Sequence, residues 1–164
     1  MKDYQLHQIK ELVYDTCNFE FSNLVHDSES EEYQACSFQI NSFQIIHRLS
    51  KITPTKIGQF VTIWKRNDKG ITTPFDYSDN LDFIIITSKS SENLGQFVFP
   101  KSVLLEKGII SNNNTSGKRG FRVYPPWDIP TSKQAKKTQL WQTKHFYSIT
   151  EKSFDIELVK RLFR

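Results

Sequence analysis

The sequence predicts a mixed α+β (α/β) domain in which a central mixed sheet is flanked by helices. Three observations support this class. Apolar residues recur with helical spacing near both ends of the chain, whereas the middle of the chain alternates with the period of a strand. The stretch LDFIIIT at 81–87 is rich in β-branched residues, as in a strand that is buried on both faces. Strands and helices do not alternate regularly, which argues against a Rossmann fold.

The N-terminal half is predicted to form one helix followed by strands. Apolar residues share one face of a helix over residues 3–16, and the acidic, polar residues 18–32 are predicted to form a loop. Apolar residues then alternate on both sides of Asn41-Ser42, which predicts a hairpin that ends before Thr53-Pro54. Residues 59–66 (QFVTIWKR) are predicted to form one further strand.

The C-terminal half continues with a turn, shorter strands and two amphipathic helices. Asn67 to Gly70 is a typical turn sequence, and residues 108–120, with three consecutive asparagines, are predicted to be an exposed loop. Thr131 or Ser132 is a suitable N-cap for a helix that runs to about residue 144. The same patterns predict strands at 81–87, 95–99 and 121–124, and helices at 102–107 and 153–163.

We expect a single domain over residues 1–164, because the chain contains no internal repeat and no linker. Thirteen Phe, six Tyr and three Trp provide enough apolar surface for one aromatic-rich core. Cys17 and Cys36 lack CxxC spacing, so two free thiols are expected rather than a disulfide framework. The N-terminus has no apolar signal-peptide core, and no apolar run reaches the ~18 residues that span a bilayer. A soluble, cytoplasmic protein without a membrane partner is therefore expected.

Basic residues are concentrated in two segments, whereas the N-terminal quarter is acidic. Residues 44–69 carry a net charge of +5, residues 117–144 carry +6, and residues 1–43 carry −6, although the whole chain carries only +4. Such clustering is typical of a surface that binds a polyanion. The alternative interpretation is an ordinary solvated surface and a protected edge strand.

The first functional hypothesis is binding of nucleic acid, most simply DNA. Lysine and arginine neutralise phosphates, and aromatic rings such as Trp64 stack on exposed bases. The predicted phosphate contacts are Arg48, Lys51, Lys56, Lys65, Arg66, Lys118, Arg119, Arg122, Lys133, Lys136 and Lys137.

The second hypothesis is a Mg²⁺-dependent nuclease, the only case in which a cofactor is expected. Glu32, Asp82, Gln96 and Lys101 resemble the acids and lysine with which nucleases hold a metal and a water molecule. The second strand acid is absent, since Gln96 offers only a neutral oxygen, and this weakens the case for hydrolysis. Asp76 and Asp79 are better explained as turn residues.

Other enzyme classes have little support in the sequence. The four histidines are scattered without metal-ligand spacing, and the chain contains no GxSxG, GxGxxG or GxxxxGK[ST] motif. Cys17 and Cys36 lie near acids, which raise the pKa of a thiol and make it a poorer nucleophile.

Three strings resemble the MepB-like family: KITPTKIGQFVTIWKR at 51–66, FRVYPPWD at 121–128 and KQAKKTQLWQTKHF at 133–146. The family is named for a gene beside a multidrug efflux pump gene and its regulator. The resemblance implies a restriction-endonuclease-like fold and nucleic-acid binding rather than cleavage, and it carries over no catalytic residue. A third hypothesis is therefore a protein-interaction or small-ligand module linked to multidrug resistance, with aromatic residues such as Trp127 lining a pocket.

Overall fold

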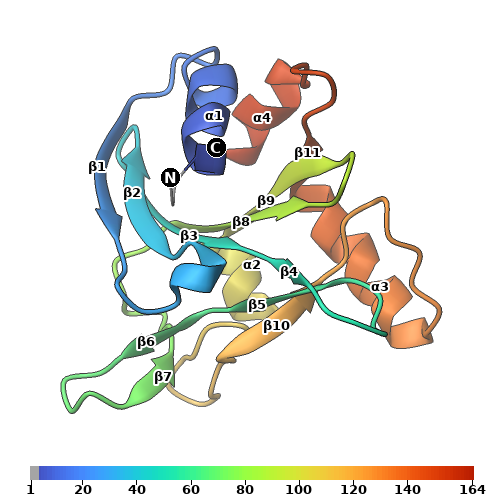
Figure 1. Cartoon of the computed structure of the whole chain (residues 1–164). Coiled ribbons are helices and arrows are strands. Elements are labelled where there is room, and N and C mark those ends of the chain that lie inside the picture. Colours follow the sequence, from blue (N-terminus) through green and yellow to red (C-terminus); the bar gives the residue numbers. More distant parts are fainter. Residues whose placement is uncertain (1–3) are drawn as a thin grey trace.

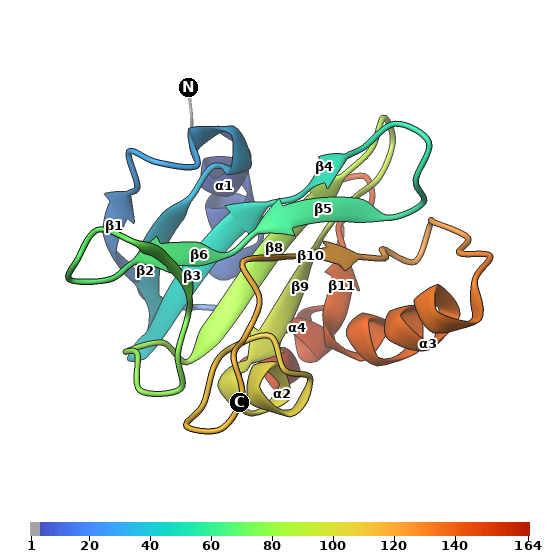
Figure 2. The same cartoon turned by 90° about the horizontal axis from the view of Figure 1, so that it is seen from below.

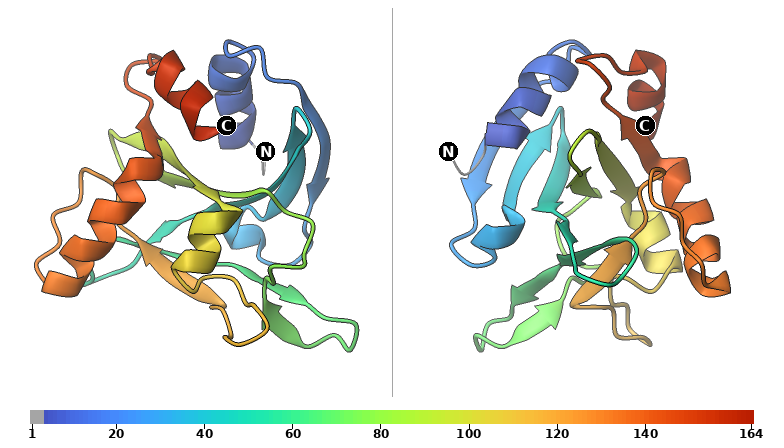
Figure 3. Two further views of the ribbon diagram at one scale, coloured as in Figure 1. Left: turned by 180° about the vertical axis from the view of Figure 1, so that it is seen from behind. Right: turned by 45° about the vertical axis from the view of Figure 1, so that its right-hand side comes forward.

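The computed structural model describes residues 4–164 and consists of three layers (Figure 1). Helices α1 and α4 lie side by side on one face of a six-stranded sheet. A smaller three-stranded sheet, the β6–β7 ribbon and helix α2 cover the opposite face, and helix α3 lies along one side (Figure 3). The prediction of a mixed α+β domain built on a mixed sheet flanked by helices is confirmed. The helices are α1 (Tyr4–Ile9), α2 (Lys101–Glu106), α3 (Lys133–Gln142) and α4 (Ile156–Leu162).

The large sheet has the strand order β1-β2-β3-β8-β9-β11. Strands β3 and β8 are parallel, and every other neighbouring pair in this sheet is antiparallel. Its strands are β1 (Phe21–His26), β2 (Cys36–Ile40), β3 (Phe43–Leu49), β8 (Phe83–Lys89), β9 (Leu94–Pro100) and β11 (Phe146–Ser148). The hairpin about Asn41-Ser42 is the β2–β3 turn, as predicted, and Asn41 there adopts a positive φ of 55°.

Strand β8 shows why the sheet is buried on both faces. Phe83 and Ile85 belong to the core beneath α1 and α4, whereas Ile84 and Ile86 belong to the core shared with the smaller sheet. Alternate residues of a strand point to opposite faces, so a strand between two cores has no polar face. This confirms the interpretation of LDFIIIT as a central strand.

The smaller sheet has the order β10-β5-β4 and positions the basic segments of the chain. Val61 and Ile63 from its middle segment, and Val123 from β10, face the large sheet and are fully buried. Its strands are β4 (Lys51–Ile52), β5 (Gln59–Thr62) and β10 (Gly120–Val123), and the adjoining ribbon consists of β6 (Trp64–Arg66) and β7 (Thr72–Pro74).

The N-terminal region differs from its prediction in two respects. The helix expected over 3–16, whose first residue lies outside the described residues, is α1 followed by a π-helical turn, η1 (Lys10–Tyr14). The loop expected over 18–32 contains strand β1 and a 3-10 turn, η2 (Glu31–Tyr33). Strand β1 is an edge strand whose last four residues are all exposed, so its sequence lacks the alternation that identifies a strand.

Two further predictions are also corrected, and one strand was missed. Residues 59–66 form two strands in different sheets rather than one, with buried Ile63 between them. The loop at 108–120 is not exposed throughout, because Ile109 and Ile110 are buried in the core. Strand β11 was not predicted, since its three residues follow directly on a helical segment.

The predicted N-cap of α3 is confirmed, whereas α4 begins three residues after the predicted residue 153. Ser132 caps α3, with its Oγ accepting a hydrogen bond from the backbone N–H of Ala135 at 3.1 Å. Asp155 caps α4 in the same way, through the N–H of Leu158 at 3.1 Å. No helix among residues 4–164 is both long and apolar enough to cross a bilayer.

Candidate nucleic-acid interface

A row of cation, aromatic ring and cation crosses the outer face of the smaller sheet. Phe60 in β5 is directly opposite Arg122 in β10 and Lys51 in β4. Directly paired residues project from the same face of a sheet. Because the neighbouring Val61 and Val123 point into the core, the side chains of Lys51, Phe60 and Arg122 point outward, and each is partly exposed.

A cavity of about 290 Å³ lies at one end of this row. The β4–β5 loop contributes Lys56, β10 contributes Arg122, and the segment leading into α3 contributes Ser132. Figure 2 shows the β4–β5 loop and the start of α3 on the same side of the molecule. The structure therefore brings residues of both basic segments to one cavity, although Lys56 and Ser132 are 76 positions apart in the sequence.

Arg122 retains hydrogen-bonding capacity in this cavity. Its Nη2 donates to Thr53 Oγ1, whereas the enclosed Nη1 has no partner among the described residues. Tyr124 lines the same cavity, and its ring lies so close to Gly58 that a Cβ there would stand 2.7 Å from the ring. A guanidinium held beside aromatic and hydroxyl groups is well suited to a phosphate oxygen.

Helix α3 adds exposed positive charge beside the cavity. Lys133, Lys136 and Lys137 are all exposed, and none of them forms an ion pair with a residue in 4–164. We call the surface formed by Lys51, Lys56, Phe60, Arg122, Lys133, Lys136 and Lys137 the basic face.

The acidic N-terminal region neutralises part of the first basic segment. Lys51 Nζ lies 2.7 Å from Glu32, and Arg66 donates from both Nε and Nη2 to Glu29 at 2.8 Å. Lys65 Nζ contacts Asp79 at 2.5 Å. The hydrogen bond from Arg66 lowers the pKa of Glu29. Charges that are apart in the sequence therefore meet in space, so Lys51, Lys65 and Arg66 are less available to phosphates than the sequence suggested.

The remaining predicted contacts of the second segment lie at the opposite end of β10 from the cavity. Arg119 donates to the carbonyl of Thr72 at 3.0 Å, which joins the segment before β10 to strand β7. Lys118 beside it is exposed. Both side chains border the smaller sheet but do not line the cavity.

Arg48 is a correction to the predicted set. It lies in β3, is only 3% exposed and points toward the ring of Phe75, with 5.9 Å from its guanidinium carbon to the ring centre. A side chain enclosed between two sheets cannot contact a phosphate backbone on the surface. The sequence did not reveal this. Strand β3 is covered on both faces, so its residues do not alternate between a polar, solvent-exposed face and an apolar, buried one.

The four residues of the nuclease hypothesis do not form a site. Gln96 pairs with Thr87, which is five residues beyond Asp82 along β8, or about 16 Å at the rise of a strand. The carboxylate of Asp82 accepts a hydrogen bond from the N–H of Gln44 at 2.8 Å, and Lys101 donates to the carbonyl of Asp79 at 2.8 Å. Glu32 pairs with Lys51 beside the smaller sheet. Within the described part of the chain, no group of three or more His, Cys, Asp or Glu is arranged to hold a metal.

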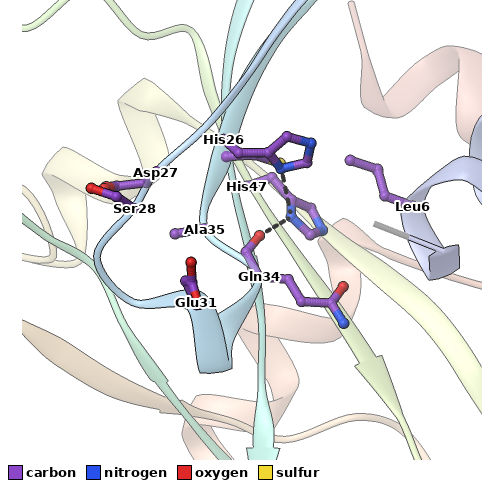
Figure 4. Close-up of a pocket in the computed structure, with 9 residues that line it drawn as sticks. Leu6, His26, Asp27, Ser28, Glu31, Gln34, Ala35 and His47 are labelled. Atoms are coloured by element: carbon purple, nitrogen blue, oxygen red, sulfur yellow. Dashed lines mark hydrogen bonds between the residues drawn. The ribbon is translucent and has the colours of Figure 1, made fainter. Parts of the chain in front are cut away.

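A pocket beside the segment that connects β1 to β2 contains a thiol–imidazole contact that sequence reasoning missed (Figure 4). Cys36 Sγ lies 3.6 Å from His47 Nδ1, which is also 3.3 Å from the carbonyl of Gln34. The register of β2 and β3 places Cys36 directly opposite His47, and that register was the signal that could have identified the pair.

The hydrogen bonds around His47 give it a structural role. Its Nε2 lies 2.8 Å from Thr87 Oγ1, and that oxygen accepts a hydrogen bond from Gln96 Nε2 at 2.9 Å. The carbonyl of Gln34 can only accept, so the proton of the neutral imidazole lies on Nδ1 facing it, and Nε2 accepts a hydrogen bond from the Thr87 hydroxyl. Burial lowers the pKa of His47 to about 4. An imidazole that is neutral and protonated on Nδ1 cannot take a proton from Cys36, so the geometry does not support a Cys–His nucleophile.

Comparison with known proteins agrees with this fold. A family model described as MepB-like matches residues 27–148. A solved structure described as "Crystal Structure of MepB" superposes with a TM-score of 0.76 and 35% sequence identity, covering 78% of this chain and 86% of that one. The search of curated proteins found no match.

Proposed function

The chain belongs to the MepB-like family, and from this premise and the basic face we propose that it binds nucleic acid, with DNA as the first substrate to test, and does not hydrolyse it. The observation that carries the proposal is the cavity at which Lys56 and Arg122 meet beside the lysines of α3. These residues come from both basic segments, and lysine and arginine gathered on one surface can neutralise several phosphates at once.

Two partly exposed rings favour contacts with bases as well as phosphates. Phe60 lies between Lys51 and Arg122 on the outer face, and Tyr33 meets its ring edge at a centroid distance of 6.5 Å. Lys51 Nζ lies 4.9 Å from the centre of the Tyr33 ring. Aromatic rings between cations bind unpaired bases with little sequence preference, and phosphate contacts add no base information. We therefore expect weak sequence specificity.

The proposed absence of hydrolysis rests on the separation of the nuclease-like residues. Asp82, Gln96 and Lys101 each use their polar atoms within the fold, and the first two lie far apart along the sheet. We therefore propose that the protein resembles nucleases in its fold, as the family resemblance implies, but binds nucleic acid without cleaving it.

The test is fluorescence anisotropy of labelled duplex and single-stranded oligonucleotides over a range of salt concentrations. About four phosphate contacts predict a slope near −4 for log affinity against log salt with duplex DNA, and a smaller slope with single strands. Affinity that does not change between low and physiological salt concentration removes the proposal.

A further inference from the structure

A third pocket, which shares no residue with the basic face but shares residues including Asp27 and Cys36 with the pocket of Figure 4, contains a buried guanidinium. This cavity of about 250 Å³ lies between strand β3 and the β6–β7 ribbon, where Figure 2 shows β6 crossing β2 and β3. We call it the Arg48 pocket. Its walls include Asp27, Ile46, Arg48, Trp64, Lys65 and Phe75.

The hydrogen bonding of Arg48 is incomplete. Its one hydrogen bond to the described residues runs from Nη1 to the carbonyl of His47, at 2.8 Å. Its Nε is enclosed and has no partner in residues 4–164, although the residue is only 3% exposed. Buried charges in proteins are normally paired and hydrogen-bonded, so a guanidinium in this state requires an explanation.

The free edge of Arg48 is the edge that binds carboxylates. In the same protein, Arg66 uses Nε and Nη2 together to hold the carboxylate of Glu29. The equivalent edge of Arg48 has no hydrogen-bonded carboxylate among the described residues. Asp27 attracts Arg48 electrostatically and partly opposes the effect of burial, which lowers the pKa of Arg48. Lys65, which also lines the pocket, is paired with Asp79.

The other side chains that line the Arg48 pocket indicate which groups a ligand needs in addition to a carboxylate. Trp64 and Phe75 contribute aromatic rings, Ile46 contributes an aliphatic surface, and Lys65 contributes a second cation. We propose that the Arg48 pocket binds a small organic anion, a carboxylate carried on a flat apolar body. The carboxylate lies against the Nε–Nη2 edge of Arg48, and the apolar body lies between the rings. Of the two cations in the walls, Lys65 is paired with Asp79, whereas the charge of the buried Arg48 is only partly offset by Asp27, so a positively charged ligand of the same size is disfavoured.

Benzoate is the probe, with benzylamine as a cation of matched size and benzyl alcohol as a neutral control. Titrations are followed by two-dimensional NMR of the ¹⁵N-labelled protein, through the Trp64 indole and Arg48 Nε–H signals. A Trp64→Leu spectrum assigns the indole signal. We expect benzoate to shift both signals saturably, and benzylamine and benzyl alcohol to leave them in place. No saturable benzoate response, or an equal response to benzylamine, overturns the proposal.

Two substitutions at Arg48 separate ligand binding from a structural role. Arg48→Met removes the charge at similar volume, and we expect the Trp64 signal to respond to benzoate about ten- to a hundredfold more weakly. Arg48→Lys keeps the charge but loses the planar fork, and we expect about tenfold weaker binding. A structural role alone predicts a lower melting temperature for both variants. The proposal predicts instead that benzoate raises the melting temperature of the wild type and not that of Arg48→Met. Unchanged benzoate affinity in either variant contradicts it.

Discussion

Arg122 and Arg48 show how the surroundings of a residue, rather than its type, decide its role. Both are arginines of strands in basic segments, and in each a guanidinium nitrogen has no hydrogen-bond partner among residues 4–164. Arg122 lies on the outer face of the smaller sheet and borders a cavity, whereas Arg48 is enclosed between the large sheet and the segments that cover it. The first is available to a polymer on the surface, and the second is accessible only from within the Arg48 pocket.

Replacement of Arg122 tests the phosphate contact directly. Arg122→Gln keeps a polar side chain but removes the charge and the fork, so we expect the affinity for DNA to fall about tenfold or more. Arg122→Lys retains the charge and should recover part of the loss. Anisotropy titration at low salt measures both. Arg48→Met is the matched control, with an expected DNA affinity equal to that of the wild type, and an equal loss in both variants contradicts the assignment.

The pH dependence of stability reports the buried state of His47. Its pKa is about 4 in the folded protein, below the ordinary value of 6.5. The unfolded chain therefore binds a proton first as the pH falls, so folding stability is retained above about pH 6.5 and lost down to about pH 4. The loss approaches about 3 kcal/mol. Urea unfolding at several pH values measures it, with His47→Gln as the reference. The difference between the two proteins should change across this range, and parallel curves contradict the assignment.

At the scale of elements, helix α3 positions the lysines of the basic face. A local signal in the sequence, its N-cap residue, determines where this helix begins. Ser132 caps its first turn, and Gln142 near its end is fully buried. Gln142 Oε1 accepts the N–H of Tyr124 at 2.8 Å, and its Nε2 donates to the carbonyl of Arg122 at 2.9 Å. These bonds tie the C-terminal end of the helix to β10, so the lysines and Arg122 keep a common orientation.

Removal of the α3 cap tests this arrangement. Ser132→Ala leaves the N–H of Ala135 without its acceptor, and we expect a loss of about 1 kcal/mol in the free energy of unfolding. Ser132→Asp restores an acceptor and should recover the stability. Urea denaturation monitored by circular dichroism provides the values. A Ser132→Ala protein as stable as the wild type would show that the hydrogen bond at the cap contributes nothing.

At the scale of the whole molecule, the acidic and basic regions of the sequence partly neutralise one another on folding. Glu29 and Glu32 pair with bases of the first segment, whereas the lysines of α3 stay unpaired among the described residues. The unbalanced positive charge is therefore displaced toward β10 and α3, which is where the cavity lies.

This asymmetry predicts which charges control binding. The double variant Lys136→Glu/Lys137→Glu should weaken DNA binding and reduce the salt slope by about two. The double variant Lys152→Glu/Arg164→Glu changes the net charge equally, at exposed residues of the C-terminal region, and serves as the control. Equal effects of the two variants would indicate a general charge effect rather than a localised face.

Incubation with a substrate tests the absence of hydrolysis. Supercoiled plasmid with Mg²⁺ or Mn²⁺ should show no nicking by the wild type, because Asp82 and Gln96 lie about 16 Å apart along β8 and β9. Asp82→Ala should give the same result. Nicking that disappears in Asp82→Ala would establish a nuclease and contradict the proposal.

The sequence by itself determined the features that depend on neighbouring residues. The β2–β3 turn, the cap at Ser132, the buried strand 81–87 and the amphipathic helix α4 were predicted because spacing and side-chain chemistry within a few residues specify each of them. Strand pairing decided the rest. Edge strand β1, the division of 59–66 between two sheets and the burial of Arg48 all depend on partners distant in the sequence. For the same reason, only the tertiary structure placed Lys56 and Arg122 at one cavity and separated Asp82 from Gln96.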